Sequence, residues 1–442
     1  MEKRKMKGKI FVVAATVIAV CAAVYLIFNI VFSPYWNSVY PPPGYLSLIS
    51  MSTAESDDII YTKKQAEEDL DYIVKCLERV HPMYKNGIDD DVKACLEKEK
   101  NLFGEEVTSY ELWRSAARLL HSTGDSHDLI APSFPRKYLV DYLDRMESGC
   151  TVLTINGMTV DELFSKKSDL FSYELEAWGE YALQNCFQTL EGLRFIGFDS
   201  DSFEFIYLNE KGIEEAVTYS LGDFYDYDSA AEMLNKETED VPLYSCVVDK
   251  ENDYSLLTLD SCDYDEEYRT FLYKFIEDTT AADIDNIIVD LRDNSGGNSM
   301  VADEFIAYLN YDTFRTQGGV WRLGPYMMKW EPSEEKIKHY DEMLFDGDVY
   351  VLTSTRTFSS GTLFAEFIQD NGFGKVVGES CGNKPDSYGD VVVFQTPNSV
   401  LSFQISSKHF DRIDTSKSDL PIIPDIECDA DDALEEVLNV IK

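Results

Sequence analysis

The sequence predicts an α/β protein whose C-terminal half folds around a parallel β-sheet. From about residue 253 onward, apolar runs of strand length alternate with amphipathic helical segments, an order that favours a parallel sheet with right-handed crossovers. One of these runs, NIIVDLR at 286–292, is apolar over most of its length, as expected for a strand covered on both faces of the sheet. Apolar residues make up 44% of the 442-residue chain, which is enough for a large core.

The N-terminal region predicts a membrane segment. Residues 10–32 contain no charged side chain, and a helix of that length would span a bilayer core of about 30 Å. Lys and Arg residues cluster in residues 1–9, and none follows the apolar run before Lys63. The positive-inside rule therefore predicts a cytoplasmic tail at 1–9, a signal anchor at 10–32 that crosses the cell membrane once, and an extracellular remainder. A cleaved signal peptide is the alternative, although its apolar region is usually about 7–15 residues long.

Charge and cysteine usage exclude several classes of function. The formal net charge of −42 repels phosphate backbones, so a nucleic-acid partner is not expected. The nine cysteines include no CxxC pair, and no acidic stretch matches the spacing of an EF-hand loop. The sequence therefore predicts no metal site and no cofactor. An extracellular location would permit disulfides, but the sequence does not pair the cysteines.

Three regions of different pattern lie between the predicted membrane segment and the α/β core. Residues 33–57 include three consecutive prolines and are predicted to be a linker. Residues 58–132 show helical periodicity with capping residues and predict a helical cap. Residues 133–225 predict a β-rich insert, in which TVLTINGMTVDELFSK has the pattern strand, turn, strand and helix. The core is predicted at 226–442.

A candidate nucleophile, Ser359, lies at a predicted strand-to-helix junction. The strand is VYVLTS, and Ser359, Ser360 and Gly361 open the following helix. The first amides of a helix have no partner within it, and together with the helix dipole they stabilise an oxyanion. Ser360 N–H is therefore a candidate oxyanion donor. The structural alternative for Ser359 is an ordinary helix N-cap.

Two further sites complete the set that acyl transfer needs. Gly296 and Gly297 follow the strand at 286–292, and glycines there would let a second backbone amide approach the same oxyanion. A base must take the proton of the serine. His127, in the loop sequence GDSHDLI, is the candidate.

The ordered motifs GDSH, RDNSGGN, TFSSGT and VVGESCGNKP resemble those of S41 peptidases, the family of the tail-specific C-terminal processing proteases, the tricorn core and the interphotoreceptor retinoid-binding protein repeats. The segment EDLDYIVKCLERVHP is similar to the N-terminal cap of the bacterial branch. The resemblance implies a ClpP/crotonase-like βαβ core. It also implies Ser359 as nucleophile, Ser360 N–H with the Gly296-Gly297 turn as oxyanion hole, and His127 as the histidine of the tricorn-like branch.

The resemblance leaves the base and the acid with alternatives. Processing proteases use a serine–lysine dyad, and Lys384 lies at the matching spacing after Ser359. In the tricorn-like branch a glutamate precedes a Gly-x-x-Pro-Asp segment; this chain has DTSKSDLPIIPD there, and Asp419 is the nearest candidate acid. The insert, where processing proteases carry a PDZ domain, resembles a PDZ domain in one short part and is equally consistent with a different β-rich unit.

The expected function is therefore an extracytoplasmic serine-type peptidase. It would hydrolyse peptide bonds in a protein or peptide substrate through an acyl-enzyme, without a cofactor. The alternative is a non-catalytic S41-like protein that binds peptides or hydrophobic ligands.

Overall fold

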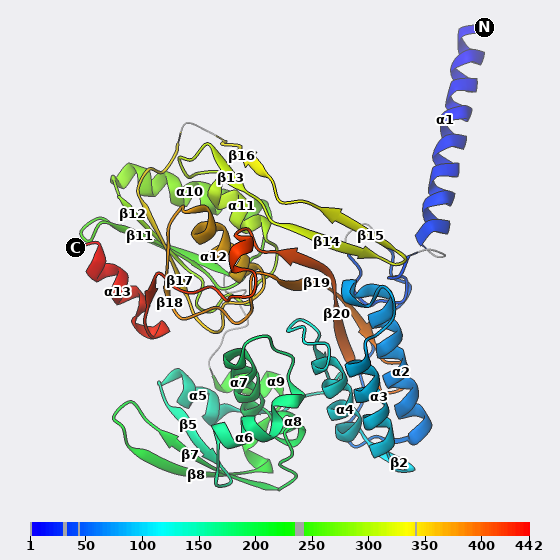
Figure 1. Ribbon diagram of the computed structural model, residues 1–442, viewed down its shortest axis with the longest axis vertical. Coiled ribbons are helices and arrows are strands. Elements are labelled where there is room, and N and C mark those ends of the chain that lie inside the picture. Colours follow the sequence, from blue (N-terminus) through cyan, green and yellow to red (C-terminus); the bar gives the residue numbers. More distant parts are fainter. Residues whose placement is uncertain (1, 30–32, 43–44, 235–242, 341–342) are drawn as a thin grey trace.

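The computed structural model describes residues 2–29, 33–42, 45–234, 243–340 and 343–442, with the backbone alone for residues 2–13. Helix α1 (Glu2–Ile27) projects from the rest of the chain (Figure 1). Among the described residues, no helix combines the length and the apolarity that a membrane crossing requires. Residues 30–32 of the predicted membrane segment lie outside the described residues. The structure thus gives the predicted span at 10–32 no support.

The core is a six-stranded sheet in the order β10-β11-β12-β17-β18-β21, and all neighbouring strands are parallel except β10 and β11. Its strands are β10 (Tyr244–Asp249), β11 (Tyr254–Leu259), β12 (Asn286–Asp290), β17 (Asp348–Thr353), β18 (Lys375–Gly378) and β21 (Ile426–Glu427). The prediction of a largely parallel sheet in an α/β core is confirmed.

Helices cover both faces of this sheet (Figure 1). They are α10 (Glu266–Ala282), α11 (Met300–Ile306), α12 (Ser360–Asn371) and α13 (Ala433–Val440). Successive side chains of β12 point to opposite faces. Ile287 and Val289 pack with α10, α11 and α12, whereas Ile288 packs with α13. The apolar character of the strand thus follows from its burial on both sides.

A second sheet, which the sequence analysis did not predict, lies between the core and the cap (Figure 1). Its order is β15-β14-β20-β19, and β3 pairs with the first residues of β20, Ser402 and Phe403. The strands are β3 (Ile130–Ala131), β14 (Gly318–Leu323), β15 (Tyr326–Trp330), β19 (Ser387–Gln395) and β20 (Ser402–Asp411), with a separate pair β13 (Thr313–Arg315) and β16 (Glu334–Lys336) nearby. Because β3 begins three residues after His127, this pairing fixes the histidine loop to the core.

The cap contains three helices and a short strand pair. These elements are β1 (Ile60–Thr62), α2 (Lys63–Val80), α3 (Asp90–Leu102), β2 (Glu106–Thr108) and α4 (Ser109–His121). Capping boxes at Thr62 and Thr108 begin α2 and α4, because each threonine accepts from the amide three residues on while that residue's side chain bonds back. Helix α4 ends directly before the loop that carries His127.

The insert combines a four-stranded antiparallel sheet, order β6-β5-β7-β8, with short helices. Its elements are β4 (Tyr138–Leu139), α5 (Val140–Glu147), β5 (Thr151–Ile155), β6 (Met158–Thr159), α6 (Val160–Lys167), α7 (Glu176–Asn185), α8 (Leu190–Phe195), β7 (Ser202–Leu208), β8 (Glu214–Ser220), β9 (Phe224–Tyr225) and α9 (Tyr227–Met233). Since α9 packs against β4, the insert extends beyond residue 225, where the sequence analysis placed its end.

The segment predicted as a linker, 33–57, is packed against the second sheet. Tyr35 is fully buried, and its hydroxyl donates to Arg322 O at 2.7 Å. Val39 N donates to Val393 O, so the segment pairs with the outer edge of β19. The prediction of a tether is therefore wrong for the described part of the segment, because its aromatic rings and backbone groups find partners on the core.

A buried polar network ties α12 to the end of β20. Arg412 donates to both carboxylate oxygens of Asp370 at 2.8 and 3.1 Å. Glu366, one turn before Asp370, accepts from Ile413 N and from Gln317 Nε2. Burial, opposed in part by these hydrogen bonds, raises the pKa of Glu366 to about 8. Glu366 is thus mainly protonated at neutral pH, inside the helix that begins after Ser359.

Replacing Glu366 should change how stability depends on pH. The pKa of this carboxyl is about 8 in the fold and 4.5 when unperturbed, so between these values unfolding releases a proton. The free energy of unfolding then falls as pH rises, by up to about 1.4 kcal/mol per pH unit. We expect Glu366→Gln to lack this loss and to gain stability over the wild type from about pH 5 to about pH 8 in denaturant titrations. The exposed Glu267→Gln serves as the control, and parallel pH curves for wild type and Glu366→Gln would contradict the expectation.

Candidate active site

Ser359 occupies a strained turn between β17 and α12. Its backbone has φ 54° and ψ −121°, a region that residues with a side chain seldom adopt. Its amide donates to Asn383 Oδ1 at 2.7 Å, and the preceding residue, Phe358, donates to Asn294 O at 2.9 Å. The Ser359 hydroxyl makes no capping bond to α12. The structure therefore rejects the N-cap alternative and leaves this hydroxyl free to react.

The glycine turn lies directly against Ser359. A Cβ built on Gly296 would lie 2.6 Å from Ser359 Cβ, and one on Gly297 would lie 2.4 Å from Cys262 O. Ser360 Oγ also donates to Gly297 O at 2.8 Å. Only glycine permits this approach of two backbones, and both glycines have positive φ. The predicted neighbourhood of the glycine pair and the serine is thus present in the structure.

The two glycine amides differ in their hydrogen bonding. Gly296 N–H donates to Asn294 Oδ1 at 2.9 Å, so it is already used inside the turn. Gly297 N–H makes no hydrogen bond to any described residue, and Ser360 N–H is the first amide of α12, for which a helix provides no acceptor. The candidate oxyanion donors are therefore the amides of Gly297 and Ser360. The prediction that Gly296 also donates is wrong, because its amide is already bonded; its role is to let the turn approach Ser359 closely.

His127 lies in the loop after α4, and it lines the same cavity as Ser359. Its ring stacks at a tilt on Phe358, the residue before the nucleophile, with centroids 4.6 Å apart. Its Nδ1 lies 3.7 Å from Asp125 Oδ1 and 3.5 Å from Ser126 Oγ. Its Nε2 is buried without a hydrogen-bond partner among the described residues. An Nδ1–H directed at these oxygens leaves the Nε2 lone pair open to the cavity.

Asp125 connects His127 to a second buried histidine. Its Oδ1 accepts from His127 N at 2.8 Å, and its Oδ2 lies 3.2 Å from His81 Nε2. Burial alone would raise the pKa of Asp125, but the bonds from His127 and His81 lower it well below its ordinary value. Burial and the Asp125 charge instead raise the pKa of the neighbouring Asp128. Asp125 is therefore the ionised carboxylate behind His127.

His81, Asp125 and Asp128 lie close enough to be compared with a metal site. His81 Nδ1 accepts from Met83 N, which leaves the ring proton on Nε2. That proton is directed at Asp125 Oδ2, so Nε2 has no free lone pair for a metal. The donor set fits a hydrogen-bonded histidine–carboxylate pair that orients the catalytic loop.

Ser359 and His127 line one cavity of about 410 Å³. The other residues that line it are Gly297, Asn298, Ser299, Ser360, Leu363, Asn383, Ser387, Tyr388, Gly389, Asp390, Lys408 and Phe410. Because His127 Nε2 has no partner, Ser359 Oγ and the imidazole do not yet share a hydrogen bond in this structure. Such contacts are often long without substrate. The cavity therefore contains a hydroxyl, a proton acceptor and two free amides.

The two remaining predicted residues lie elsewhere. Lys384 is close in sequence to the site, but its side chain does not line the cavity, and its backbone amide bonds to Glu174. Asp419 is exposed in the turn after β20 and also lies outside the cavity. The structure thus brings His127, and not Lys384, to Ser359, and it does not bring Asp419.

The sequence analysis missed several residues of the site. Asp125 stands two positions before His127, so the GDSH motif itself carried a signal that was not used. Asn294 and Asn383, which hold the Ser359 turn, lie inside the quoted motifs RDNSGGN and GNKP. Glu174 accepts from Ser126 Oγ at 3.0 Å, and it comes from the insert, where no local pattern marks it.

We expect Gly296→Ala to inactivate the site without unfolding the chain. The added methyl would press on Ser359 Cβ and shift the hydroxyl, and a displacement of about 1 Å can cost about 100-fold in rate. Gly222→Ala is the matched control, since its added Cβ meets only Ser220 Oγ, at 3.7 Å. Peptidase rates and thermal unfolding would both be measured. Full activity in Gly296→Ala would contradict the placement of Ser359 as the reacting group.

Comparisons with known proteins found one family model and several solved structures. The family model of peptidase family S41 matches residues 254–428. The structure of mature CPAF complexed with lactacystin has a TM-score of 0.60 and 13% identity, and the match covers 86% of this chain and 97% of that one. The photosystem II D1 C-terminal processing protease has a TM-score of 0.44 and 10% identity, with 85% and 97% covered. No curated sequence matches the chain.

At 13% identity the CPAF structure shows a shared fold, and the likeness to the family rests on the model matched by residues 254–428. Its span includes both glycines of the turn, the strained serine and Asn383. Residues 254–428 thus match the family model of peptidase family S41, and this match supports a serine peptidase.

Proposed function

We propose that the chain hydrolyses peptide bonds through an acyl-enzyme formed on Ser359. Ser359 Oγ attacks the carbonyl carbon of the substrate while its proton passes to His127 Nε2. The imidazolium that forms is stabilised by the Asp125 carboxylate, which lies 3.7 Å from Nδ1. The backbone amides of Gly297 and Ser360 hold the negative charge of the tetrahedral oxygen.

The second half of the cycle reverses these roles. His127 gives its proton to the leaving amine, which departs with the C-terminal part of the substrate. A water molecule then attacks the ester on Ser359 and gives its proton to His127, which returns that proton to Ser359 Oγ as the ester bond breaks and the acid product leaves.

The observation that carries the proposal is the unpartnered Nε2 of His127. A buried ring nitrogen without a hydrogen bond is unfavourable, and it is retained here beside a strained serine in one cavity. Lys384 has no comparable position. Its side chain lies outside the cavity, so the serine–lysine dyad is not supported.

A fluorophosphonate probe tests the nucleophile and the base together. We expect the wild type to be labelled and Ser359→Ala not to be, with peptidase activity falling by about 10³-fold or more in Ser359→Ala and in His127→Ala. Lys384→Ala is the matched variant, and it should keep most of the activity because the hydrogen bonds of Lys384 to Glu174 and Asn383 use its backbone alone.

Two results would contradict the proposal in different ways. A dead Lys384→Ala beside an active His127→Ala would make lysine the base. A folded wild type without labelling and without peptide hydrolysis would favour the alternative, a protein that binds peptides or hydrophobic ligands.

We also propose that the peptidase lies outside the cytoplasm, attached to the cell membrane through residues 10–32. Its support is the sequence pattern of cations in residues 1–9 followed by an uncharged apolar run. We expect the full chain to sediment with membranes, to be cut by protease added to intact cells, and to become soluble when residues 1–32 are removed. Recovery of the full chain in the soluble fraction would contradict this location.

A further inference from the structure

The insert reaches the catalytic site through residues 174–178, at the start of α7. Glu174 Oε1 accepts from Ser126 Oγ at 3.0 Å, and its Oε2 accepts from Lys384 N at 3.0 Å. Ser126 precedes His127 in the cap loop, and Lys384 follows Asn383, which holds the amide of Ser359. One carboxylate of the insert therefore bonds to the loop that carries His127 and to the loop after β18, whose Asn383 holds the amide of Ser359.

A second contact of the same segment is a stack of three rings. Trp178 lies on Phe358 with centroids 4.1 Å apart and planes 13° from parallel, and Phe358 in turn contacts His127. Trp178 Nε1 is buried without a hydrogen-bond partner among the described residues, so apolar stacking fixes the ring. A Cβ on Gly382 would lie 2.7 Å from the Trp178 ring, so the glycine at this position of the core loop leaves room for the ring.

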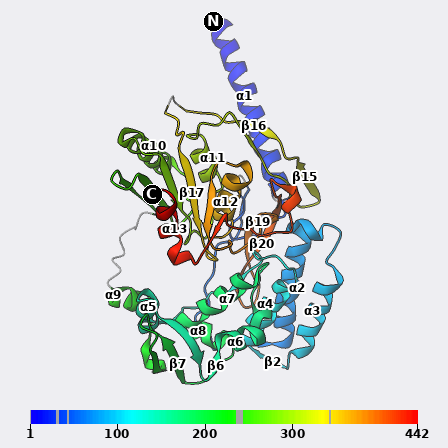
Figure 2. The ribbon, with the colours of Figure 1, turned by 60° about the vertical axis from the view of Figure 1, so that its left-hand side comes forward.

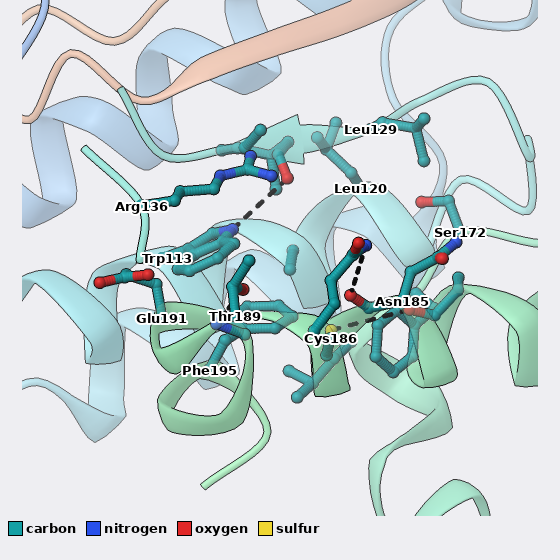
Figure 3. A pocket seen from close by; sticks show the side chains of 18 of the residues that line it. Trp113, Leu120, Leu129, Arg136, Ser172, Asn185, Cys186, Thr189, Glu191 and Phe195 are labelled. Atoms are coloured by element: carbon teal, nitrogen blue, oxygen red, sulfur yellow. Dashed lines mark hydrogen bonds between the residues drawn. The ribbon is translucent and has the colours of Figure 1, made fainter. Parts of the chain in front are cut away.

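The rest of the boundary between the insert and the cap is less completely filled. A cavity of about 210 Å³ lies there, and Figure 3 shows Trp113 of the cap, Leu129 of the histidine loop and Ser172 of the insert around it. Figures 1 and 2 show α7 on the side of the insert that faces the core. The polar bonds of Glu174 and the stack of Trp178 thus join the insert to the loops around Ser359 and His127, as does Ser172 Oγ, which donates to Asp128 O at 2.6 Å, beside a boundary that leaves space for small shifts.

We propose that Glu174 and Trp178 are positioning residues through which the insert assembles the catalytic site. Glu174 orients Ser126 and thereby the Nδ1 side of His127. Trp178 holds Phe358, and with it the strained turn at Ser359. This inference rests on the proposed roles of Ser359 and His127, and it makes the peptidase rate depend on how the insert sits against the core.

The chemistry of Glu174 fits this role. Both of its partners are donors, so the ionised carboxylate satisfies both. Burial and the nearby Asp125 raise its pKa, which means that the two hydrogen bonds offset an unfavourable site for the charge. Glutamine in its place turns one acceptor into a donor, which opposes one of the two donors and breaks one of the two links.

Isosteric substitution tests Glu174. We expect Glu174→Gln to lower kcat by up to about 100-fold with little change in KM, because the substrate contacts remain while the base is misplaced. Fluorophosphonate labelling of Ser359 should slow in parallel, with no matching loss in thermal stability. The exposed Glu176→Gln, two residues away, is the control and should behave as wild type.

A double-mutant cycle shows whether Glu174 acts through Ser126. The effect of Glu174→Gln should be much smaller in a Ser126→Ala background than in the wild type. For the stack, we expect Trp178→Ala to lower kcat by roughly tenfold and Trp178→Phe to restore most of it, since phenylalanine can keep the ring contact.

The outcomes separate the two proposals. Wild-type kcat in Glu174→Gln and Trp178→Ala, or additive effects of Glu174→Gln and Ser126→Ala, would overturn the positioning roles and leave the nucleophile untouched. Activity that survives Ser359→Ala would instead overturn the proposed function. If Trp178→Ala unfolds, Trp178→Phe replaces it.

Discussion

The strained backbone at Ser359 is the constraint on which the rest of the site depends. A serine at φ 54° is unfavourable by about 1–3 kcal/mol, and it persists only where its surroundings fix it. Here Asn294, Asn383 and the close approach of Gly296 hold the turn from both sides. The strain serves the chemistry, since it turns the hydroxyl away from the helix end and leaves the first helical amide free.

The architecture explains how distant segments meet at this turn. The carboxyl ends of neighbouring parallel strands lie along one edge of a sheet, which places the turn after β12 beside the turn after β17. The second sheet adds the histidine loop, because β3 pairs with β20. Through Glu174 the insert then bonds to the histidine loop and to the loop after β18, whose Asn383 holds the Ser359 amide. The core, the histidine loop and the insert each contribute side chains or amides to the site, and none of the three forms the site alone.

Local pattern was sufficient for some parts of this structure and insufficient for others. The parallel sheet could be predicted because β12 is buried on both faces and is therefore apolar, and the neighbourhood of the glycine turn and Ser359 follows from strand order. The second sheet and Glu174 could not be predicted, since both depend on pairing between residues far apart in sequence. Asp419 was expected only from the resemblance to a family motif that this chain does not keep. Asp125 instead stands behind His127, two positions earlier in the chain.

The burial of Tyr35 moves the start of the folded unit to about residue 33. The segment that it anchors covers the outer edge of β19 at Val393, where backbone groups would otherwise be open to pairing. An uncovered edge strand invites pairing with other chains. The proline run alone would suggest that residues before 58 are a spacer that can be removed. A chain that begins at residue 58 would lose more than that. The space that Tyr35 fills beside Arg322 would be left empty, and the edge of β19 would be open to pairing with other chains. The segment that contains Tyr35 and Val39 therefore protects the protein from aggregation.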